Sequence, residues 1–184
     1  MKILNIHGYK GSAENSACLV LKEMGFDVIS PQIDYDAENP EKILDNLRKI
    51  FTESKPDYIV GTSLGGFFAL LLSVEFKAVR HNSYLQKKEK CNYPTILVNP
   101  CLLPFVTLPE LGYEKNIKEF IGLFGKFTNI YGDIYAIIGG QDEVIDYHDF
   151  TIQLIGKRHY ILVPNGKHSG ATLNLDVCFR RLIK

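Results

Sequence analysis

The sequence has no excess of charge of either sign. Lys and Arg together number 21, as do Asp and Glu, so the formal net charge is zero with neutral histidines. Proteins that bind nucleic acids or anionic membranes usually carry a strongly basic surface. The composition therefore favours neither of these partners. The 184 residues, 46% of them hydrophobic, are instead typical of one soluble globular domain with a full core.

A long hydrophobic run is also missing. The longest one, residues 67–72, is far shorter than the roughly 20 residues that span a bilayer as a helix. The first eleven residues, MKILNIHGYKG, have too few apolar residues for the core of a secretory signal peptide. We therefore expect no membrane span and a cytoplasmic protein.

Patterns typical of disulfide and metal sites are missing as well. The four cysteines form no C-x-x-C pair and have mostly apolar neighbours, so we predict buried or half-buried free thiols. No H-x-H or H-E-x-x-H spacing is present, and we predict no metal site and no cofactor. Cys101 follows an expected strand close to a site, but a buried thiol is also the simplest interpretation there. The cysteines are Cys18, Cys91, Cys101 and Cys178.

Short apolar runs alternate along the chain with longer amphipathic ones. The apolar runs are nearly continuous in Val, Ile and Leu, a pattern typical of strands that are covered on both faces. The sequence thus predicts an α/β fold: a mostly parallel central sheet of about six strands with helices on both faces. The predicted strands are 2–8, 26–31, 57–62, 95–100, 133–140 and 159–166, and the predicted helices are 14–24, 40–51, 64–76, 114–127 and 171–183.

Two segments depart from this alternation. Residues 77–93 are basic and polar, and we interpret them as a solvated surface insertion. Residues 104–130 carry two prolines and a glycine before the helix predicted there. Because they lie between the fourth and fifth strands, we predict a short lid-like segment over the carboxyl ends of the strands. They are too short for a separate domain, so we expect one domain over residues 1–184.

Ser63 lies in the motif G-x-S-x-G, within the stretch YIVGTSLGGFF. An expected strand enters the motif and an expected helix leaves it, which is the arrangement of a nucleophile elbow. Such a turn brings chain segments very close, and Gly61 and Gly65 would avoid side-chain clashes there. The alternative is that Ser63 merely caps the helix.

A serine hydroxyl needs a histidine as its base. His168 follows the last predicted strand in a glycine-flanked loop, so it reaches the carboxyl end of the sheet, where such sites lie. It is our predicted base. The other histidines are predicted to have other roles. We place His81 in the basic insertion, His148 in a helix at the surface, and His159 at the start of a strand, where its side chain could point either way. His7 is predicted to organise its loop.

The carboxylate that orients the histidine should follow the preceding strand. Asp142 comes first after the turn at Gly139 and Gly140 and is the predicted acid, while Asp146 stays open as an alternative. The resulting chain order, serine, aspartate and then histidine, is that of the α/β-hydrolases. For the oxyanion hole we predict the backbone N–H groups of Leu64, directly after the serine, and Tyr9, in the loop HGYKGS after the first strand.

With these residues placed, the chain resembles the small bacterial esterases of the YqiA-like family. The likeness is carried in order by NIHGYKGS, SPQIDY, VGTSLGGFFA, LVNPCLLPF, GGQDEVIDY and NGKHSG. The resemblance implies a three-layer α/β-hydrolase fold with a minimal cap. It also implies esterase activity on acyl esters, with Ser63 as nucleophile, Asp142 as acid and His168 as base. The basic segment 77–93 departs from the family pattern, as does the lack of an aromatic residue directly behind His168.

Our leading hypothesis is thus a carboxylic ester hydrolase acting on a small-molecule acyl ester. A thioesterase with the same triad is the nearest alternative, and Lys87, Lys88 and Lys90 would then contact a phosphate of CoA. An alternative of another class is an inactive ligand-binding protein on a hydrolase scaffold. The sequence predicts neither the acyl chain nor an oligomeric state.

Overall fold

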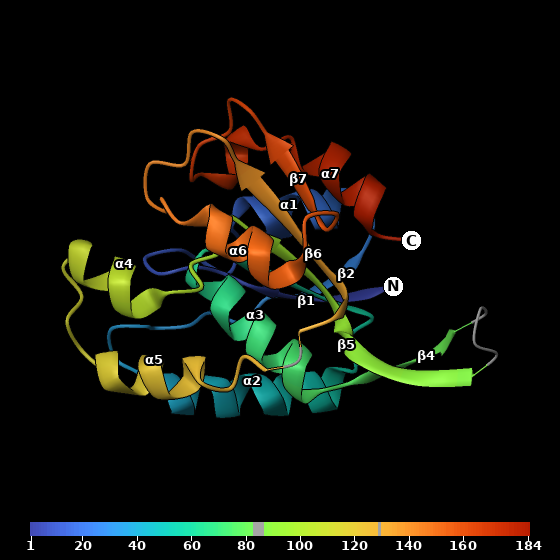
Figure 1. The fold of residues 1–184 in the computed structure, drawn as a ribbon, viewed down its shortest axis with the longest axis horizontal. Coiled ribbons are helices and arrows are strands. Elements are labelled where there is room, and N and C mark those ends of the chain that lie inside the picture. Colours follow the sequence, from blue (N-terminus) through green and yellow to red (C-terminus); the bar gives the residue numbers. More distant parts are fainter. Residues whose placement is uncertain (83–86, 129) are drawn as a thin grey trace.

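The computed structural model describes residues 1–82, 87–128 and 130–184, and of residues 78–82 and 87–91 it describes the backbone alone. Six strands run parallel to one another in the order β2-β1-β3-β5-β6-β7 (Figure 1). The prediction of a mostly parallel sheet is confirmed. The strands are β1 (Lys2–Ile6), β2 (Asp27–Ile29), β3 (Tyr58–Thr62), β4 (Ala78–Asn82), β5 (Lys87–Val98), β6 (Gly132–Gly139) and β7 (Tyr160–Val163).

Helices cover both faces of this sheet, as predicted. On one face α1 and α7 pack together, and on the other α2, α3 and α5 form a layer (Figure 1). The α-helices are α1 (Ser16–Glu23), α2 (Pro40–Ser54), α3 (Leu64–Glu75), α4 (Pro104–Glu110), α5 (Ile117–Phe124), α6 (His148–Ile155) and α7 (Leu175–Leu182), and the 3₁₀ turn η1 spans Gly170–Thr172.

Neighbouring residues of a central strand enter two different cores. In β1, Ile3 packs with Leu21 and Phe179 of the α1–α7 face, whereas Leu4 packs with Leu44 and Phe68 of the other face. All of them are buried. Successive side chains of a strand point to opposite faces, so a strand covered on both sides must be apolar at every position. This explains why the apolar runs are continuous rather than alternating.

The helix that follows Ser63 is apolar on all sides. Residues 64–73 of α3 are buried throughout. A helix with no polar face is stable only when it is surrounded, and α3 lies between the sheet and the helices α2 and α5. The start of α3, and with it Ser63, is therefore held firmly at the carboxyl end of β3.

The structure sharpens several predicted boundaries. The first helix begins at Ser16 rather than residue 14, because the side chain of Asn15 caps it by accepting the N–H of Cys18 at 2.9 Å. The predicted closing helix 171–183 is wrong in its first part. There the chain forms η1, passes through Asn174 in the left-handed conformation at φ 48°, and only then enters α7.

Segment 104–130 contains two helices where the sequence predicted one. The predicted helix is α5, and α4 precedes it. Phe120 of α5 is buried and contacts Phe67 and Phe68 of α3 edge-on, with ring centroids 5.7 and 6.3 Å apart. Part of the segment thus belongs to the helical layer. The lid-like role stays a prediction.

Strand β4 pairs antiparallel with the first part of β5, and this hairpin projects from the body of the molecule (Figure 1). It coincides with most of the basic segment predicted as a surface insertion. The side chains of Lys87, Lys88 and Lys90 lie outside the described residues, and so does that of Cys91. The other three cysteines are buried free thiols, as predicted.

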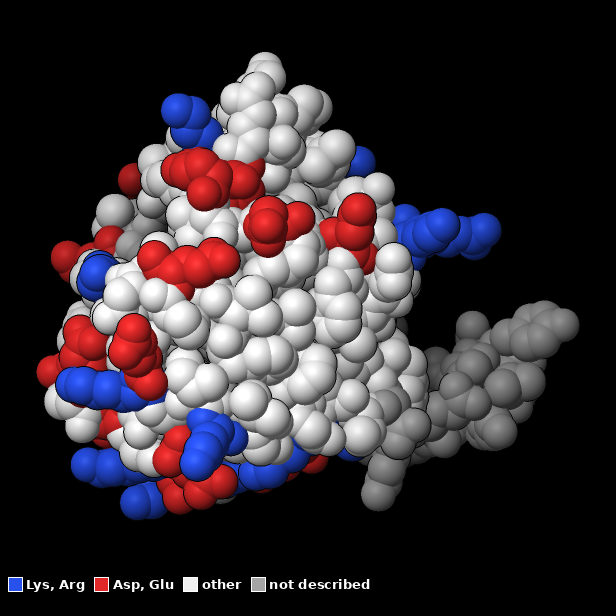
Figure 2. Space-filling model, turned by 60° about the vertical axis from the view of Figure 1, so that its left-hand side comes forward, with Lys and Arg blue, Asp and Glu red and all other residues white. Residues whose placement is uncertain are grey.

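Charges of both signs are spread over the face drawn in Figure 2, with a broad uncharged area between them. This distribution agrees with the balanced composition of the sequence. Among the described residues, none of the helices is both long enough and apolar enough to cross a membrane.

Candidate active site

Ser63 occupies the sharp turn between β3 and α3. Its backbone lies at φ 52° and ψ −121°, a conformation that non-glycine residues rarely adopt. Two backbone hydrogen bonds tie it to β5 and the loop after β5: Ser63 N donates to Val98 O at 2.9 Å, and Cys101 N donates to Ser63 O at 3.0 Å. Such a strained position persists only where the surroundings fix it, and it is typical of functional sites. The serine makes no side-chain cap to α3, so the helix-cap interpretation is wrong.

The glycines of the motif permit this turn. A Cβ atom at Gly65 would collide with the carbonyl oxygen of Ile6 and lie 2.6 Å from that of His7. A Cβ atom at Gly61 would collide with the carbonyl oxygen of Gly65 and lie 2.6 Å from the Cβ of Ala69. Both positions therefore require glycine, because backbone segments from β1, β3 and α3 meet there.

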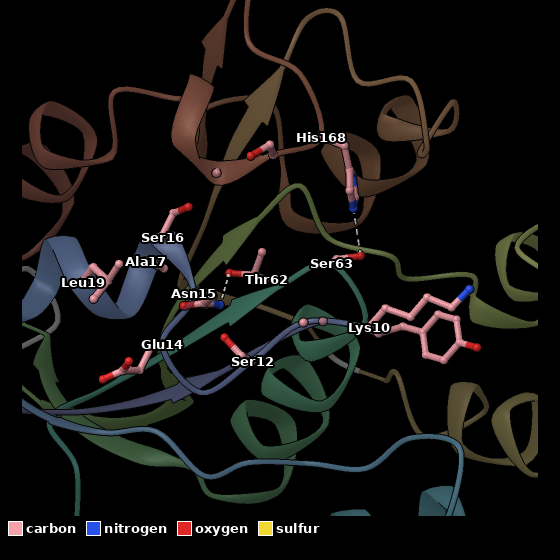
Figure 3. A pocket seen from close by; sticks show the side chains of 15 residues that line it. Lys10, Ser12, Glu14, Asn15, Ser16, Ala17, Leu19, Thr62, Ser63 and His168 are labelled. Carbon is pink, nitrogen blue, oxygen red and sulfur yellow. Dashed lines mark hydrogen bonds between the residues drawn. The ribbon is translucent and has the colours of Figure 1, made fainter.

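His168 lies in the loop after β7, directly opposite Ser63 (Figure 3). Its Nε2 is 3.1 Å from Ser63 Oγ, so the two residues are hydrogen-bonded across the sheet edge. The amide of Asn99, after β5, holds this loop by donating to the carbonyl oxygens of Lys167 at 2.8 Å and of His168 at 3.1 Å. The carboxylate of Glu143 accepts the backbone N–H of His168 at 3.1 Å.

Asp142 lies on the other side of the imidazole. His168 Nδ1 is 3.0 Å from both carboxylate oxygens of Asp142, whose side chain is 1% exposed. Burial alone would raise the pKa of Asp142. The hydrogen bonds from His148, from His168 and from two backbone N–H groups outweigh it and hold the pKa well below its ordinary value. Asp142 is thus ionised wherever the protein is folded near neutral pH.

The alternative acid does not reach the histidine. Both ring nitrogens of His168 are already bonded, one to Ser63 and the other to Asp142. Asp146 is exposed to solvent. Among the predicted residues, the structure thus brings Ser63, His168 and Asp142 into one chain of hydrogen bonds and leaves Asp146 outside it.

His148 is the residue of this site that the sequence analysis misplaced. It was expected at the surface, but its side chain is only 12% exposed and its Nε2 lies 2.9 Å from Asp142 Oδ2. The turn after Asp142 explains the difference. Asp142 Oδ1 accepts the N–H groups of Val144 and Ile145 and bends the chain, so that the first residue of α6 returns to the carboxylate. The sequence pattern that could have indicated this position is an aspartate followed by a short turn and the start of a helix.

The two predicted oxyanion donors flank Ser63. Leu64 is the first residue of α3, where a backbone N–H has no acceptor within its own helix. A Cβ atom at Gly8 would lie 2.8 Å from Ser63 Cβ, so the loop that carries Tyr9 passes directly beside the serine. These positions are compatible with two N–H groups converging on an oxygen bound at Ser63.

His7 organises the loop that carries Tyr9, as predicted. It is 1% exposed, its Nε2 accepts the N–H of Ile33 at 2.9 Å, and its Nδ1 lies 2.8 Å from Gly8 O. An Nε2 that accepts must be unprotonated, so Nδ1 carries the proton and donates to Gly8. Burial lowers the pKa of His7, which keeps the ring neutral.

A cavity of about 590 Å³ opens beside Ser63 (Figure 3). It lies between the loop at residues 8–12, the start of α1 and the loop at residues 168–170. Most of its walls are glycine and small polar side chains, among them Ser12, Asn15 and Ser16. Of the histidines, only His168 lines this cavity in the described part of the chain, so a bound molecule would meet Ser63 and His168 together.

The residues near Ser63 do not form a metal centre. Across the described ranges, no three His, Cys, Asp or Glu side chains are placed to hold a metal ion. Cys101 is close to the site through its backbone, but its thiol is 2% exposed and 3.4 Å from the hydroxyl of Tyr147. Burial raises the pKa of Cys101, which disfavours the thiolate.

The sequence profile of the uncharacterised protein family UPF0227 matches residues 2–121. The chain belongs to UPF0227. The match contains Ser63 and the loop with Tyr9, and it ends before Asp142 and His168. No curated protein matches this UPF0227 chain.

Solved structures place the UPF0227 chain among the α/β-hydrolases in fold. Est1E from Butyrivibrio proteoclasticus is 15% identical, with 98% of this chain and 84% of that one aligned at a TM-score of 0.66. Alpha/beta hydrolase domain-containing protein 10 from mouse is 14% identical, with coverages of 98% and 88% and a TM-score of 0.66. A structure from the metagenome-derived lipolytic enzymes LipS and LipT is 14% identical, with coverages of 98% and 90% and a TM-score of 0.69. At these identities the likeness establishes the fold alone.

Proposed function

We propose that this protein is a serine hydrolase that cleaves small-molecule acyl esters through an acyl-enzyme intermediate. The observation that carries the proposal is the hydrogen-bonded chain from Ser63 Oγ through His168 to Asp142. The strained backbone of Ser63 supports it, because a nucleophile elbow presents its hydroxyl in this way. The fold agrees, since structural neighbours include esterases and lipolytic enzymes.

In the proposed reaction, Ser63 Oγ attacks the carbonyl carbon of the ester while His168 Nε2 takes the hydroxyl proton. The N–H groups of Leu64 and Tyr9 donate to the negative oxygen of the tetrahedral intermediate. The intermediate collapses as His168 returns the proton to the departing alcohol. Water then attacks the acyl-serine with His168 as base, which releases the acid and frees Ser63. Asp142 stabilises the imidazolium in both halves of the reaction.

We propose that the substrates are short, because the cavity lining mixes Tyr9, Ala17 and Leu19 with small polar side chains. Its small hydroxyl and amide side chains offer no long apolar channel in which successive methylene groups of an acyl chain would be buried. Each methylene that stays in water forgoes the roughly 0.8 kcal/mol of its burial. We therefore propose short acyl esters, or esters with a polar partner, ahead of long-chain lipids.

The test uses a series of p-nitrophenyl esters from acetate to laurate, with the wild-type protein and the Ser63→Ala variant. We expect kcat/KM to be highest for the short esters and Ser63→Ala to lower kcat by about 10⁴-fold or more. A fluorophosphonate probe should label Ser63 in the wild type. Full turnover by Ser63→Ala, or a folded wild type without a probe adduct, would overturn the proposal. Comparing the turnover of acyl-CoA with that of oxygen esters that carry the same acyl groups distinguishes a thioesterase from an esterase.

A further inference from the structure

We infer that His148 is a positioning residue of this site: its imidazole donates to the carboxylate of Asp142 and fixes the orientation and charge that His168 meets. The inference rests on the proposed function, because it concerns the same histidine and the same proton transfer. His148 neither lines the cavity beside Ser63 nor bonds to the serine. Its effect is therefore exerted through Asp142.

The contacts of the carboxylate show why one more donor matters. Oδ1 accepts the N–H groups of Val144 at 2.9 Å and Ile145 at 3.0 Å, and Oδ2 accepts His148 Nε2 at 2.9 Å. His168 Nδ1 lies 3.0 Å from each oxygen. Without His148, all described hydrogen-bond donors to Asp142 other than His168 would bond to Oδ1 and none to Oδ2. His148 is the contact that holds Oδ2 and keeps the carboxylate plane facing the imidazole.

The donation also defines the tautomer of His148. A carboxylate only accepts, so Nε2 of His148 must carry a proton. The other nitrogen, Nδ1, is buried and has no hydrogen-bond partner among the described residues. In a neutral ring with its proton on Nε2, that N–H donates to the carboxylate of Asp142. The only ring nitrogen of His148 then left without a partner in the described part of the chain is Nδ1, which is an acceptor.

Two imidazoles thus share one negative charge. The N–H of His148 draws part of that charge to itself, so Asp142 stabilises the imidazolium of His168 less than an unshared carboxylate would. If His148 cannot donate, the full charge of Asp142 faces the imidazolium of His168. The acid limb of the kcat/KM profile would then move upward, a change that loss of packing alone would not produce.

Other titratable groups near His148 have to be separated from this effect. A second cavity, of about 390 Å³, is lined by Asp142 and His148 with Asp146, Asp149 and Tyr160, and Ser63 does not line it. These groups come from α6, from the loop before it and from β7. Asp149 is exposed and one residue beyond His148, so Asp149→Asn changes the charge of this cavity without touching the hydrogen bond.

The experiment compares His148→Leu, His148→Gln and Asp149→Asn by full pH profiles on one short ester. We expect His148→Leu to lower kcat by about tenfold at similar KM, and to shift the acid limb to higher pH. His148→Gln, whose amide can donate at about the same place, should restore most of the rate and the position of the limb. Asp149→Asn should leave the limb in place.

Three outcomes would overturn the inference. The first is a His148→Leu profile that coincides with that of the wild type. The second is an equal loss in His148→Leu and His148→Gln at every pH, which would mark a purely structural role. The third is an equal shift in Asp149→Asn, which would assign the effect to the charge of the cavity. Thermal unfolding of each variant accompanies the kinetics.

A measurement on Ser63→Ala keeps this test independent of ester turnover. In protein labelled with ¹⁵N-histidine, NMR should show His148 with its proton on Nε2 and hydrogen-bonded. A proton on Nδ1 instead would overturn the inference even if His148→Leu failed to fold. A wild type without hydrolysis and without a probe adduct would overturn the proposed function and leave the tautomer result standing.

Discussion

Asp142 accepts hydrogen bonds from two imidazoles and two backbone N–H groups, and its side chain is 1% exposed. The Asp142→Asn variant keeps the shape of this side chain but removes its charge and turns one acceptor into a donor. His168 would then be held in the wrong tautomer, with Nδ1 as an acceptor. We expect kcat to fall by about 10⁴-fold while KM changes little. Steady-state kinetics on a short ester measures the loss.

Asp146→Asn is the matched control, because it makes the same chemical change four residues away in an exposed position. We expect its kcat to stay within about twofold of the wild type, as is usual for a surface substitution away from the reacting groups. A large loss in Asp146→Asn with an active Asp142→Asn would reverse the assignment of the acid.

His7 predicts a dependence of stability on pH. Burial lowers its pKa, and protonation of Nε2 would break the bond from the N–H of Ile33. In the unfolded chain the pKa is about 6.5. Below that pH the unfolded state binds a proton that the folded state refuses, so the free energy of unfolding falls as the pH falls. The loss ends at the lowered pKa of the folded protein.

Urea unfolding at a series of pH values between 7 and 5 tests this. The contribution of His7 is at most about 1.4 kcal/mol per pH unit. We expect the decline to be shallower in His7→Gln, which cannot take up the proton. Parallel curves for the two proteins would contradict the prediction. Asp142 affects stability in a different pH range. Because its pKa is lowered in the folded protein, its protonation reduces the free energy of unfolding only below about pH 4.

Individual residues of the proposed site could be predicted where chemistry restricts the choice. A serine in a glycine turn needs a base, and His168 and Asp142 follow from the ends of the last two strands. His148 could not be found in the same way. Its place depends on a turn in which Asp142 Oδ1 binds the N–H groups of Val144 and Ile145, and nothing in the apolar pattern indicates which way such a turn leads.

At the scale of elements, the approach of α3 to β1 is decided by Gly65. A methyl group there meets the backbone carbonyls of Ile6 and His7, which cannot move without displacing the strand. We expect Gly65→Ala to lower the free energy of unfolding by about 1–3 kcal/mol or more, as overpacking does, and to abolish ester turnover. Denaturant unfolding and kinetics measure the two effects.

Gly122 gives the opposite expectation for the same substitution. It lies in α5, is exposed, and a Cβ atom there would meet nothing within 4 Å. Because glycine weakens a helix, Gly122→Ala should raise the free energy of unfolding by about 0.5–1 kcal/mol and leave turnover unchanged. If both variants lost stability alike, the close contact at Gly65 would not be the cause.

Elements with strong apolar periodicity could be predicted, and those set by local turns could not. The six parallel strands and α2 follow from the pattern, and Pro40 and Gly25 mark boundaries. Strand β4 and the first part of β5 were not predicted, because they lie in the basic, polar segment 77–93, which has no apolar run. Helix α4 was missed because it is short and contains Pro109, which argues against a helix. The late start of α7 depends on Asn174 at positive φ, a conformation that the sequence permits but does not require.

At the scale of the whole molecule, we propose that residues 1–184 fold as a single unit. The family profile covers residues 2–121, but β6 pairs with β5, and α7 packs on α1. A fragment of residues 1–131 would expose one edge of β5 and the apolar side of α1. We expect it to show no cooperative unfolding by circular dichroism, whereas the full chain unfolds in one transition. A cooperative transition in the fragment would contradict the proposal.

The hydrogen bond between His168 and Ser63 joins residues 105 positions apart in the chain. During synthesis the amino-terminal part emerges first, so the serine and its turn leave the ribosome long before their base. On the proposed function, a nascent or partly folded chain therefore carries a serine without the histidine that would activate it. On that function, fluorophosphonate labelling would report only chains in which His168 has been made and has folded against Ser63.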